Sequence, residues 1–199
     1  MLFRSESALV TDKLRKGETI EMWPSVRGAK NWPHAAYNPN TGLLYANTNH
    51  QGSIYRFVPV EYKPGQRFVG MENTLTTPKP GEPLGHVEAI EPLTGKARWR
   101  VPQMDNQVWS AMLATAGGLL FNGKHTGEFY AMDADNGETL WSFRTSSGVN
   151  SQPVTWTANG KQYVTVLSGL GGLYGQAHRV QRLPNVPLGG TVWTFALPD

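Results

Sequence analysis

The sequence has no cysteine among its 199 residues. This absence excludes disulfide bonds, thiolate zinc sites, cysteine nucleophiles and the covalent attachment of a c-type haem. It does not identify a cellular compartment, because a periplasmic protein need not contain disulfide bonds.

Charge and long apolar runs are also scarce. Charged residues make up 17% of the chain, below the roughly 25% of an average globular protein. The net charge of +3 is not gathered into a basic face with interleaved aromatic residues, so nucleic-acid binding is not expected. No run of about 18 apolar residues could span a membrane. The first residues lack the regions of a secretory signal, so the chain either stays in the cytoplasm or begins downstream of its precursor's start.

Glycine, proline and tryptophan are abundant instead. The chain has 22 glycines, 14 prolines and seven tryptophans. This composition argues against a helical bundle, a coiled coil or a disordered tail. It favours an all-β fold in which many short strands are joined by tight turns.

One motif occurs twice, with Ala, an acidic residue, Gly and Trp at offsets 0, 2, 6 and 10. Its copies run over residues 89–99 and 131–141, so they begin 42 residues apart. This separation is the length of one four-stranded propeller blade. We expect the acidic residue to accept backbone N–H bonds in a turn and the glycine to supply a positive φ. Trp99 and Trp141 then act as structural wedges between neighbouring blades.

Further similarities divide the chain into three units. Gly42-Leu-Leu-Tyr resembles Gly118-Leu-Leu-Phe, and Asn159-Gly begins a turn and strand in the same role. The predicted units are 28–105, with a Pro- and Gly-rich surface insertion at 50–85, then 106–145 and 146–199, where residues 189–197 form a last strand. Residues 1–27 are interpreted as a remnant of a preceding blade or a linker. Because propellers have roughly four to eight blades, we expect three consecutive C-terminal blades of a larger propeller.

The order of the motifs resembles a known family over residues 22–199. The chain resembles the C-terminal third of the quinoprotein alcohol dehydrogenases. These are eight-bladed enzymes of the methanol/ethanol dehydrogenase family that depend on pyrroloquinoline quinone (PQQ). The resemblance rests on both Trp motifs, on the Gly-Leu-Leu strands, and on the segments Gly28-Ala-Lys-Asn31-Trp32-Pro33 and Ser168-Gly-Leu-Gly-Gly172. It implies a β-propeller of the eight-bladed quinoprotein type.

The resemblance also implies a cofactor site. PQQ lies beside Ca²⁺ or a lanthanide in the family, and a primary alcohol loses a hydride to the quinone. Asn31 and Trp32 match the pair that contacts the cofactor, Trp109 matches a ring-edge contact, and Leu173 falls where relatives carry a Trp or a small residue near PQQ. At Leu173 we expect a backbone contact instead of a side-chain contact.

Other parts of the family's active site belong to earlier blades. These are the metal ligands, the catalytic Asp, the cofactor-pairing Arg and an adjacent-cysteine disulfide, so we expect no catalytic residue and no metal ligand in this chain, and no activity from it alone. We also expect no fused cytochrome domain within this chain, because no Cys-x-x-Cys-His follows the last strand. The resemblance implies a soluble c-type cytochrome as electron acceptor, a periplasmic location for the complete family protein, and a possible homo-oligomer.

Several residues have simpler structural interpretations. Asp133 and Asp135 could suggest a cation site, but in a hairpin turn they are expected to cap backbone groups. The histidines at 34, 50, 86, 125 and 178 lack metal-ligand spacing and are expected at surface or loop positions. The glycines of 169–172 are expected to form a tight turn at the propeller mouth, since no phosphate-loop lysine accompanies them.

Two classes of function remain open from the sequence. The first is a piece of a PQQ-dependent alcohol dehydrogenase. The second is a non-enzymatic propeller of similar repeats that acts as a protein-binding scaffold. In the scaffold, Asn31 is a turn residue, whereas Trp32 and Trp109 pack in the core. The order of these three residues favours the enzyme.

Overall fold

The computed structural model describes residues 8–66, 68–105, 109–171 and 185–197. These residues form antiparallel sheets with one short helix, and they divide into two compact units. Unit 1 is built from residues 1–29 and 50–80, and unit 2 from residues 30–49 and 81–199. No helix within the described residues is both long and apolar enough to cross a membrane.

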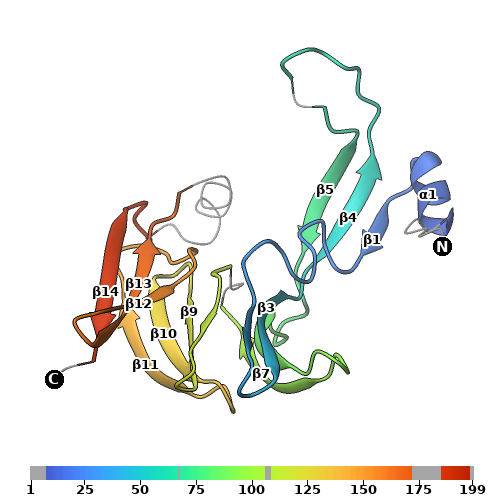
Figure 1. The fold of residues 1–199 in the computed structure, drawn as a ribbon. Coiled ribbons are helices and arrows are strands. Elements are labelled where there is room, and N and C mark those ends of the chain that lie inside the picture. The colour runs from blue at the N-terminus through green and yellow to red at the C-terminus, as the bar shows by residue number, and fades with distance from the viewer. Residues whose placement is uncertain (1–7, 67, 106–108, 172–184, 198–199) are drawn as a thin grey trace. The chain divides into compact units, whose positions relative to one another are not determined.

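Unit 1 is a small sheet with a helix. It contains α1 (Ala8–Arg15), β1 (Ile20–Met22), β4 (Gly52–Phe57) and β5 (Met71–Thr76), with the strands in the order β1-β4-β5 (Figure 1). Ile20 and Tyr55 face each other across β1 and β4, and both are buried. Arg56 on β4 forms a 2.6 Å ion pair with Glu72 on β5.

Most of the segment predicted as an insertion lies in unit 1. Its two Pro- and Gly-rich stretches are connections, one after β4 and the other after β5. β4 pairs with β1, which comes from the part of the chain predicted as a remnant or linker. The two segments therefore share one sheet, although the sequence analysis assigns them to separate parts of the chain.

Unit 2 contains three sheets, each with its strands in antiparallel order. The first sheet has β2 (Ala36–Asn38), β3 (Leu43–Asn49), β6 (Gly85–Ile90) and β7 (Ala97–Gln103). The second has β8 (Leu113–Ala114), β9 (Leu119–Gly123), β10 (Glu128–Asp133) and β11 (Thr139–Arg144). The third has β12 (Val154–Ala158), β13 (Lys161–Ser168) and β14 (Thr191–Ala196).

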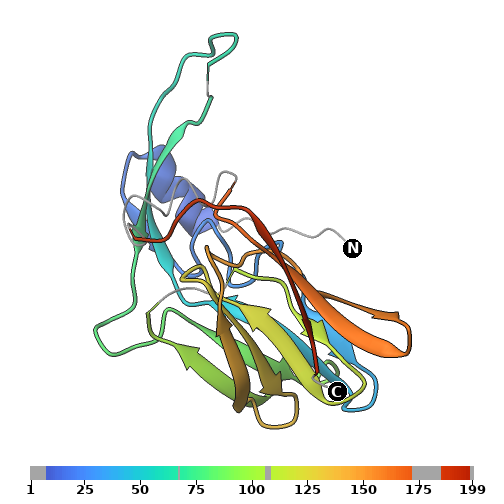
Figure 2. The same cartoon turned by 90° about the vertical axis from the view of Figure 1, so that its left-hand side faces the viewer.

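The central strands of the second sheet, β9 and β10, are buried on both faces, and most of their successive positions are apolar. Leu120 and Met132 face the first sheet, in a cluster with Tyr45 and Val87. The alternate residues of the same strands face the third sheet, where Phe121, Phe129, Ala131, Val164 and Val166 form a second cluster. Figure 1 shows the second sheet, in yellow, between the other two, and Figure 2 shows the same stack turned by 90°.

The repeated motif joins neighbouring sheets as the sequence predicts. Trp99 on β7 donates its indole N–H to the carbonyl oxygen of Ala134 at 3.0 Å. Gly137 has φ +79°, and a Cβ there would lie 2.8 Å from the Trp99 ring. A glycine is therefore required both by the turn and by the close approach of the indole. The Asp133 carboxylate accepts the backbone N–H of Asp135 at 2.7 Å, which confirms the predicted cap.

Trp141 lies at the equivalent place between the second and third sheets. Its ring centroid is 5.1 Å from that of Phe195 on β14, in an edge-to-face arrangement. It is 39% exposed and contacts its neighbours through ring packing. Both tryptophans are therefore wedges, and Trp99 adds a hydrogen bond to the next sheet.

The third sheet buries one face and exposes the other. β12 and β13 are joined by Asn159 and Gly160, whose φ values of +50° and +75° are those of a two-residue hairpin turn. On the outer face, the ring of Trp156 stacks at 4.5 Å on its neighbour in β13. Leu167 lies directly opposite Val192, and the Val192 side chain is 64% exposed. This face is an apolar surface without a covering layer among the described residues.

The contacts of Trp99 predict an unequal cost for two similar substitutions. Trp99→Phe removes the hydrogen bond to Ala134 and part of the packing on Gly137, so the free energy of unfolding should fall by about 1–3 kcal/mol. The matched control is Trp141→Phe, which keeps an aromatic ring against Phe195 and should cost less. Urea unfolding followed by circular dichroism at low protein concentration measures both. Equal losses would contradict a specific role for the indole N–H.

The outer face of the third sheet predicts self-association. Because this face exposes several large apolar side chains, sedimentation velocity should show oligomers that increase with protein concentration. Val192→Lys places a charge in the face and should shift the distribution toward the monomer. Leu93→Lys is the control, since Leu93 is fully exposed in the turn between β6 and β7. A compact monomer at all concentrations would show that the prediction is wrong.

Candidate functional site

The predicted site residues lie on two connections that lead into neighbouring strands. Asn31 and Trp32 precede β2, the first strand of the first sheet, and Trp109 precedes β8, the first strand of the second sheet. β2 and β8 contact each other. The remaining predicted residue, Leu173, lies outside the described residues.

The connection before β2 is held by its own polar groups. The Asn31 side-chain oxygen accepts the backbone N–H of Trp32 at 2.7 Å. The Lys30 ammonium donates to the carbonyl oxygens of Asn31, at 2.8 Å, and of Pro33. Burial lowers the pKa of Lys30 below its ordinary value. Lys30 was not predicted from the sequence, where it is one of many isolated lysines.

The two connections meet through the backbone. The N–H of Met112 donates to the carbonyl oxygen of His34 at 3.0 Å. The two tryptophans that are predicted to contact the cofactor differ in exposure: Trp32 is 62% exposed, whereas Trp109 is 2% exposed. The structure therefore brings the segments of Asn31 and Trp109 together, with one ring on the surface and the other in the interior.

A buried pair of amides contacts the residue that follows Trp109. Asn122 on β9 donates to the side-chain oxygen of Asn47 on β3 at 2.7 Å, and the Asn47 amide donates back at 3.3 Å. Asn47 also donates to the carbonyl oxygen of Ser110 at 2.5 Å. All three residues are buried. The pair thus connects the first sheet, the second sheet and the residue that follows Trp109.

The histidines differ in part from the expectation of surface or loop positions. His86 lies in β6, and His125 is buried in the connection between β9 and β10. This connection is covered by the chain that follows β11, because Thr145 donates to the Gly127 carbonyl and Val149 to the Lys124 carbonyl. Within the described ranges, no group of three His, Cys, Asp or Glu residues is close enough to hold a metal ion.

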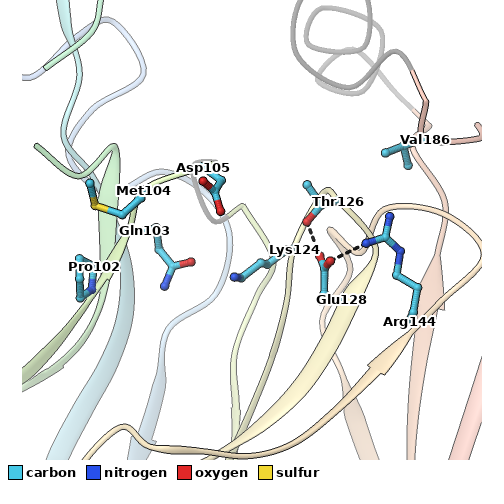
Figure 3. Close-up of a pocket in the computed structure, with 9 residues that line it drawn as sticks. All are labelled: Pro102, Gln103, Met104, Asp105, Lys124, Thr126, Glu128, Arg144 and Val186. Carbon is cyan, nitrogen blue, oxygen red and sulfur yellow. Dashed lines mark hydrogen bonds and ion pairs between the residues drawn. The ribbon is translucent and has the colours of Figure 1, made fainter. Parts of the chain in front are cut away.

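Unit 2 also has a charged pocket of about 330 Å³ at the ends of β7, β10 and β11 (Figure 3). Figure 3 shows Lys124 and Arg144 on opposite sides of Glu128. Arg144 forms a 2.5 Å ion pair with Glu128, which also accepts a hydrogen bond from Thr126. The other lining residues are Pro102, Gln103, Met104, Asp105 and Val186.

The charges of this pocket compensate one another. Burial acts to raise the pKa of Glu128, but the hydrogen bond from Thr126 and the charges of Arg144 and Lys124 outweigh it, so the net pKa is lowered. Glu128 therefore stays ionised and paired with Arg144. Asn31, Trp32 and Trp109 do not line this pocket, so it is separate from the predicted site.

Comparisons with known proteins identify relatives of the chain. The family profile described as "Glucose/ethanol/alcohol dehydrogenase, beta-propeller domain" matches residues 81–164. Quinoprotein alcohol dehydrogenase PedH of Pseudomonas putida is 39% identical over 186 residues, which cover 92% of this chain and 31% of PedH. Quinoprotein ethanol dehydrogenase of Pseudomonas putida is 37% identical over 190 residues, covering 92% of this chain and 29% of that protein.

The fold agrees with these relatives. The structure of a europium-containing methanol dehydrogenase superposes with a TM-score of 0.81 and 30% identity, covering 89% of this chain and 34% of that one. The all-β propeller fold predicted from the sequence is thereby confirmed. The chain spans about a third of the length of the relatives that it matches. It therefore belongs to the PQQ quinoprotein alcohol and methanol dehydrogenase family, of whose β-propeller it represents a part.

Proposed function

We propose that this chain is the C-terminal part of a PQQ-dependent alcohol dehydrogenase that oxidises a primary alcohol to an aldehyde. The observation that carries the proposal is the 3.0 Å backbone hydrogen bond between Met112 and His34. It joins the two segments that the family resemblance assigns to the cofactor, although Asn31 and Trp109 are far apart in the sequence. What favours the enzyme over a scaffold is that the joined segments carry Asn31, Trp32 and Trp109 in the order of the family.

The residues of the first segment fit the chemistry of PQQ. This cofactor is a planar quinone with three carboxylates, so it needs a flat apolar surface together with N–H donors and positive charge. Trp32 offers an exposed ring, and Asn31 and Lys30 beside it carry N–H groups. The donor set of residues 30–32 therefore supports cofactor binding at this edge of unit 2.

Each site residue has a separate proposed role. Asn31 donates its amide N–H to a quinone or carboxylate oxygen of the cofactor, and Trp32 supplies an apolar surface. Trp109 is 2% exposed, so its proposed contact with the cofactor is limited to the edge of the ring. The backbone at Leu173 provides a further contact. When bound, PQQ supplies the chemistry of hydride acceptance from the alcohol carbon. No residue of this chain is proposed as a metal ligand, because the metal ligands of the family belong to earlier blades.

The wider setting follows from the same family resemblance. We propose a periplasmic location for the complete protein and a soluble c-type cytochrome as its electron acceptor. The metal in that protein is Ca²⁺ or a lanthanide, bound by residues outside this chain. The alcohol substrate is consistent with the names of the relatives, which are alcohol and ethanol dehydrogenases.

The proposal can be tested by exchanging this chain for the matching segment of PedH. The exchange protein should bind PQQ in equilibrium dialysis and reduce a dye when alcohol is added, whereas the 199-residue chain alone should show no turnover. Asn31→Ala removes an amide donor worth about 1.5–3 kcal/mol. PQQ affinity or turnover should then fall by roughly ten- to a hundredfold, at about 1.4 kcal/mol per decade.

Trp141→Phe in the same exchange protein is the control. It should lower the unfolding temperature through lost packing on Phe195 and leave PQQ affinity near that of the parent. If both substitutions lowered stability alike and neither changed PQQ binding, the assignment of Asn31 would be wrong. A folded exchange protein without PQQ binding would favour the scaffold function instead.

A further inference from the structure

The segment that carries Trp109 is held by hydrogen bonds from three directions. The Asn47 amide on the first sheet donates to the Ser110 carbonyl at 2.5 Å. The Ser110 hydroxyl donates to the carbonyl of Ser151, on the connection to the third sheet, at 3.0 Å. The Met112 N–H donates to His34, two residues after Trp32, at 3.0 Å. Residues 109–112 are thus fixed against both neighbouring sheets and against the segment of Asn31.

The amide pair occupies positions where the strand pattern predicts apolar side chains. Asn47 follows Leu43 and Tyr45 on the same face of β3, and Asn122 follows Leu120 on the same face of β9. Asn47 is 5% exposed and Asn122 is fully buried, so each amide must satisfy its hydrogen bonds within the protein. Two apolar residues would fill this space without that requirement.

The hydrogen bonds of the pair satisfy that requirement reciprocally. Each amide accepts from the other, and the Asn122 oxygen also accepts the N–H of Gly123 at 2.8 Å. The orientation of the Asn47 amide is therefore set by Asn122, and its donor points to the Ser110 carbonyl. An apolar pair could pack here but could not hold this carbonyl, so the amides select one position for the backbone beside Trp109.

We propose that Asn47 and Asn122 are positioning residues, which fix Trp109 relative to the Asn31–Trp32 segment and so preorganise the cofactor site. The effect on the cofactor rests on the proposed function, whereas the effect on Trp109 does not. The pair acts through the backbone of Ser110 and makes no contact with the cofactor itself.

Asn38 supplies a matched control for a merely structural role. It is also a buried asparagine of the first sheet, and its amide donates to a carbonyl of the second sheet, that of Thr115, at 3.2 Å. Thr115 lies in the turn between β8 and β9 and not beside Trp109. Asn38→Ala removes one buried donor between the same two sheets and should lower the unfolding temperature. Asn47→Ala should lower it at least as much, because it also leaves the Asn122 amide without its partner.

The position of Trp109 can be followed in the 199-residue chain labelled with 5-fluorotryptophan. The ¹⁹F resonance of Trp109 is assigned as the one that Trp109→Phe removes. Asn47→Ala should shift or broaden this resonance, and Asn38→Ala should leave it in place. Asn122→Ala should move it in the same direction, and this variant decides the test if Asn47→Ala does not fold. An unchanged Trp109 resonance would overturn the proposal, whatever the result with PQQ.

The effect on the cofactor is measured in the exchange protein by a double-mutant cycle. Asn47→Ala should weaken PQQ binding about tenfold or more, as expected for a misplaced site group. In the Trp109→Phe background the same substitution should cost much less, because it acts through Trp109. Additive losses would overturn the positioning role at the cofactor. If the parent exchange protein does not bind PQQ, the proposed function fails, and the ¹⁹F result alone decides the positioning of Trp109.

Discussion

The packing of the second sheet between two others is the constraint on which the structure of unit 2 depends. A strand that is buried on both faces needs apolar side chains at successive positions, and β9 and β10 have them. The sheets must also approach closely at their ends, which Gly137 permits because a Cβ there would meet the Trp99 ring. The repeated Trp motif therefore supplies the residues that allow neighbouring sheets to pack closely.

The same stacking positions the candidate site. Because β2 and β8 are the first strands of adjacent sheets and contact each other, the connections leading into them come together. The His34–Met112 hydrogen bond and the Asn47–Ser110 contact then fix those connections. A site formed by loops thus obtains its precision from strands that are packed in the core.

Local features were predictable from the sequence, and features that depend on distant partners were not. The cap at Asp133, the turn at Asn159 and the wedge of Trp99 each follow from residue types at short spacing. The pairing of β1 with β4 joins segments that no repeat relates. In the sequence, Asn47 and Asn122 are polar residues that interrupt apolar strands. Their role was not predictable, because each amide is hydrogen-bonded to a partner in another sheet. Leu173 lies outside the described residues, and the cofactor roles of Asn31, Trp32 and Trp109 remain predictions.

The stacking of the sheets also has a consequence for cooperativity. The two apolar clusters of unit 2 each join one pair of adjacent sheets, so its folding free energy approximates a sum over nearest neighbours. In such a one-dimensional array, an outer sheet can detach by losing one interface, whereas the middle sheet must lose two. Unit 2 is therefore expected to fray from its ends, with β9 and β10 as the last ordered elements.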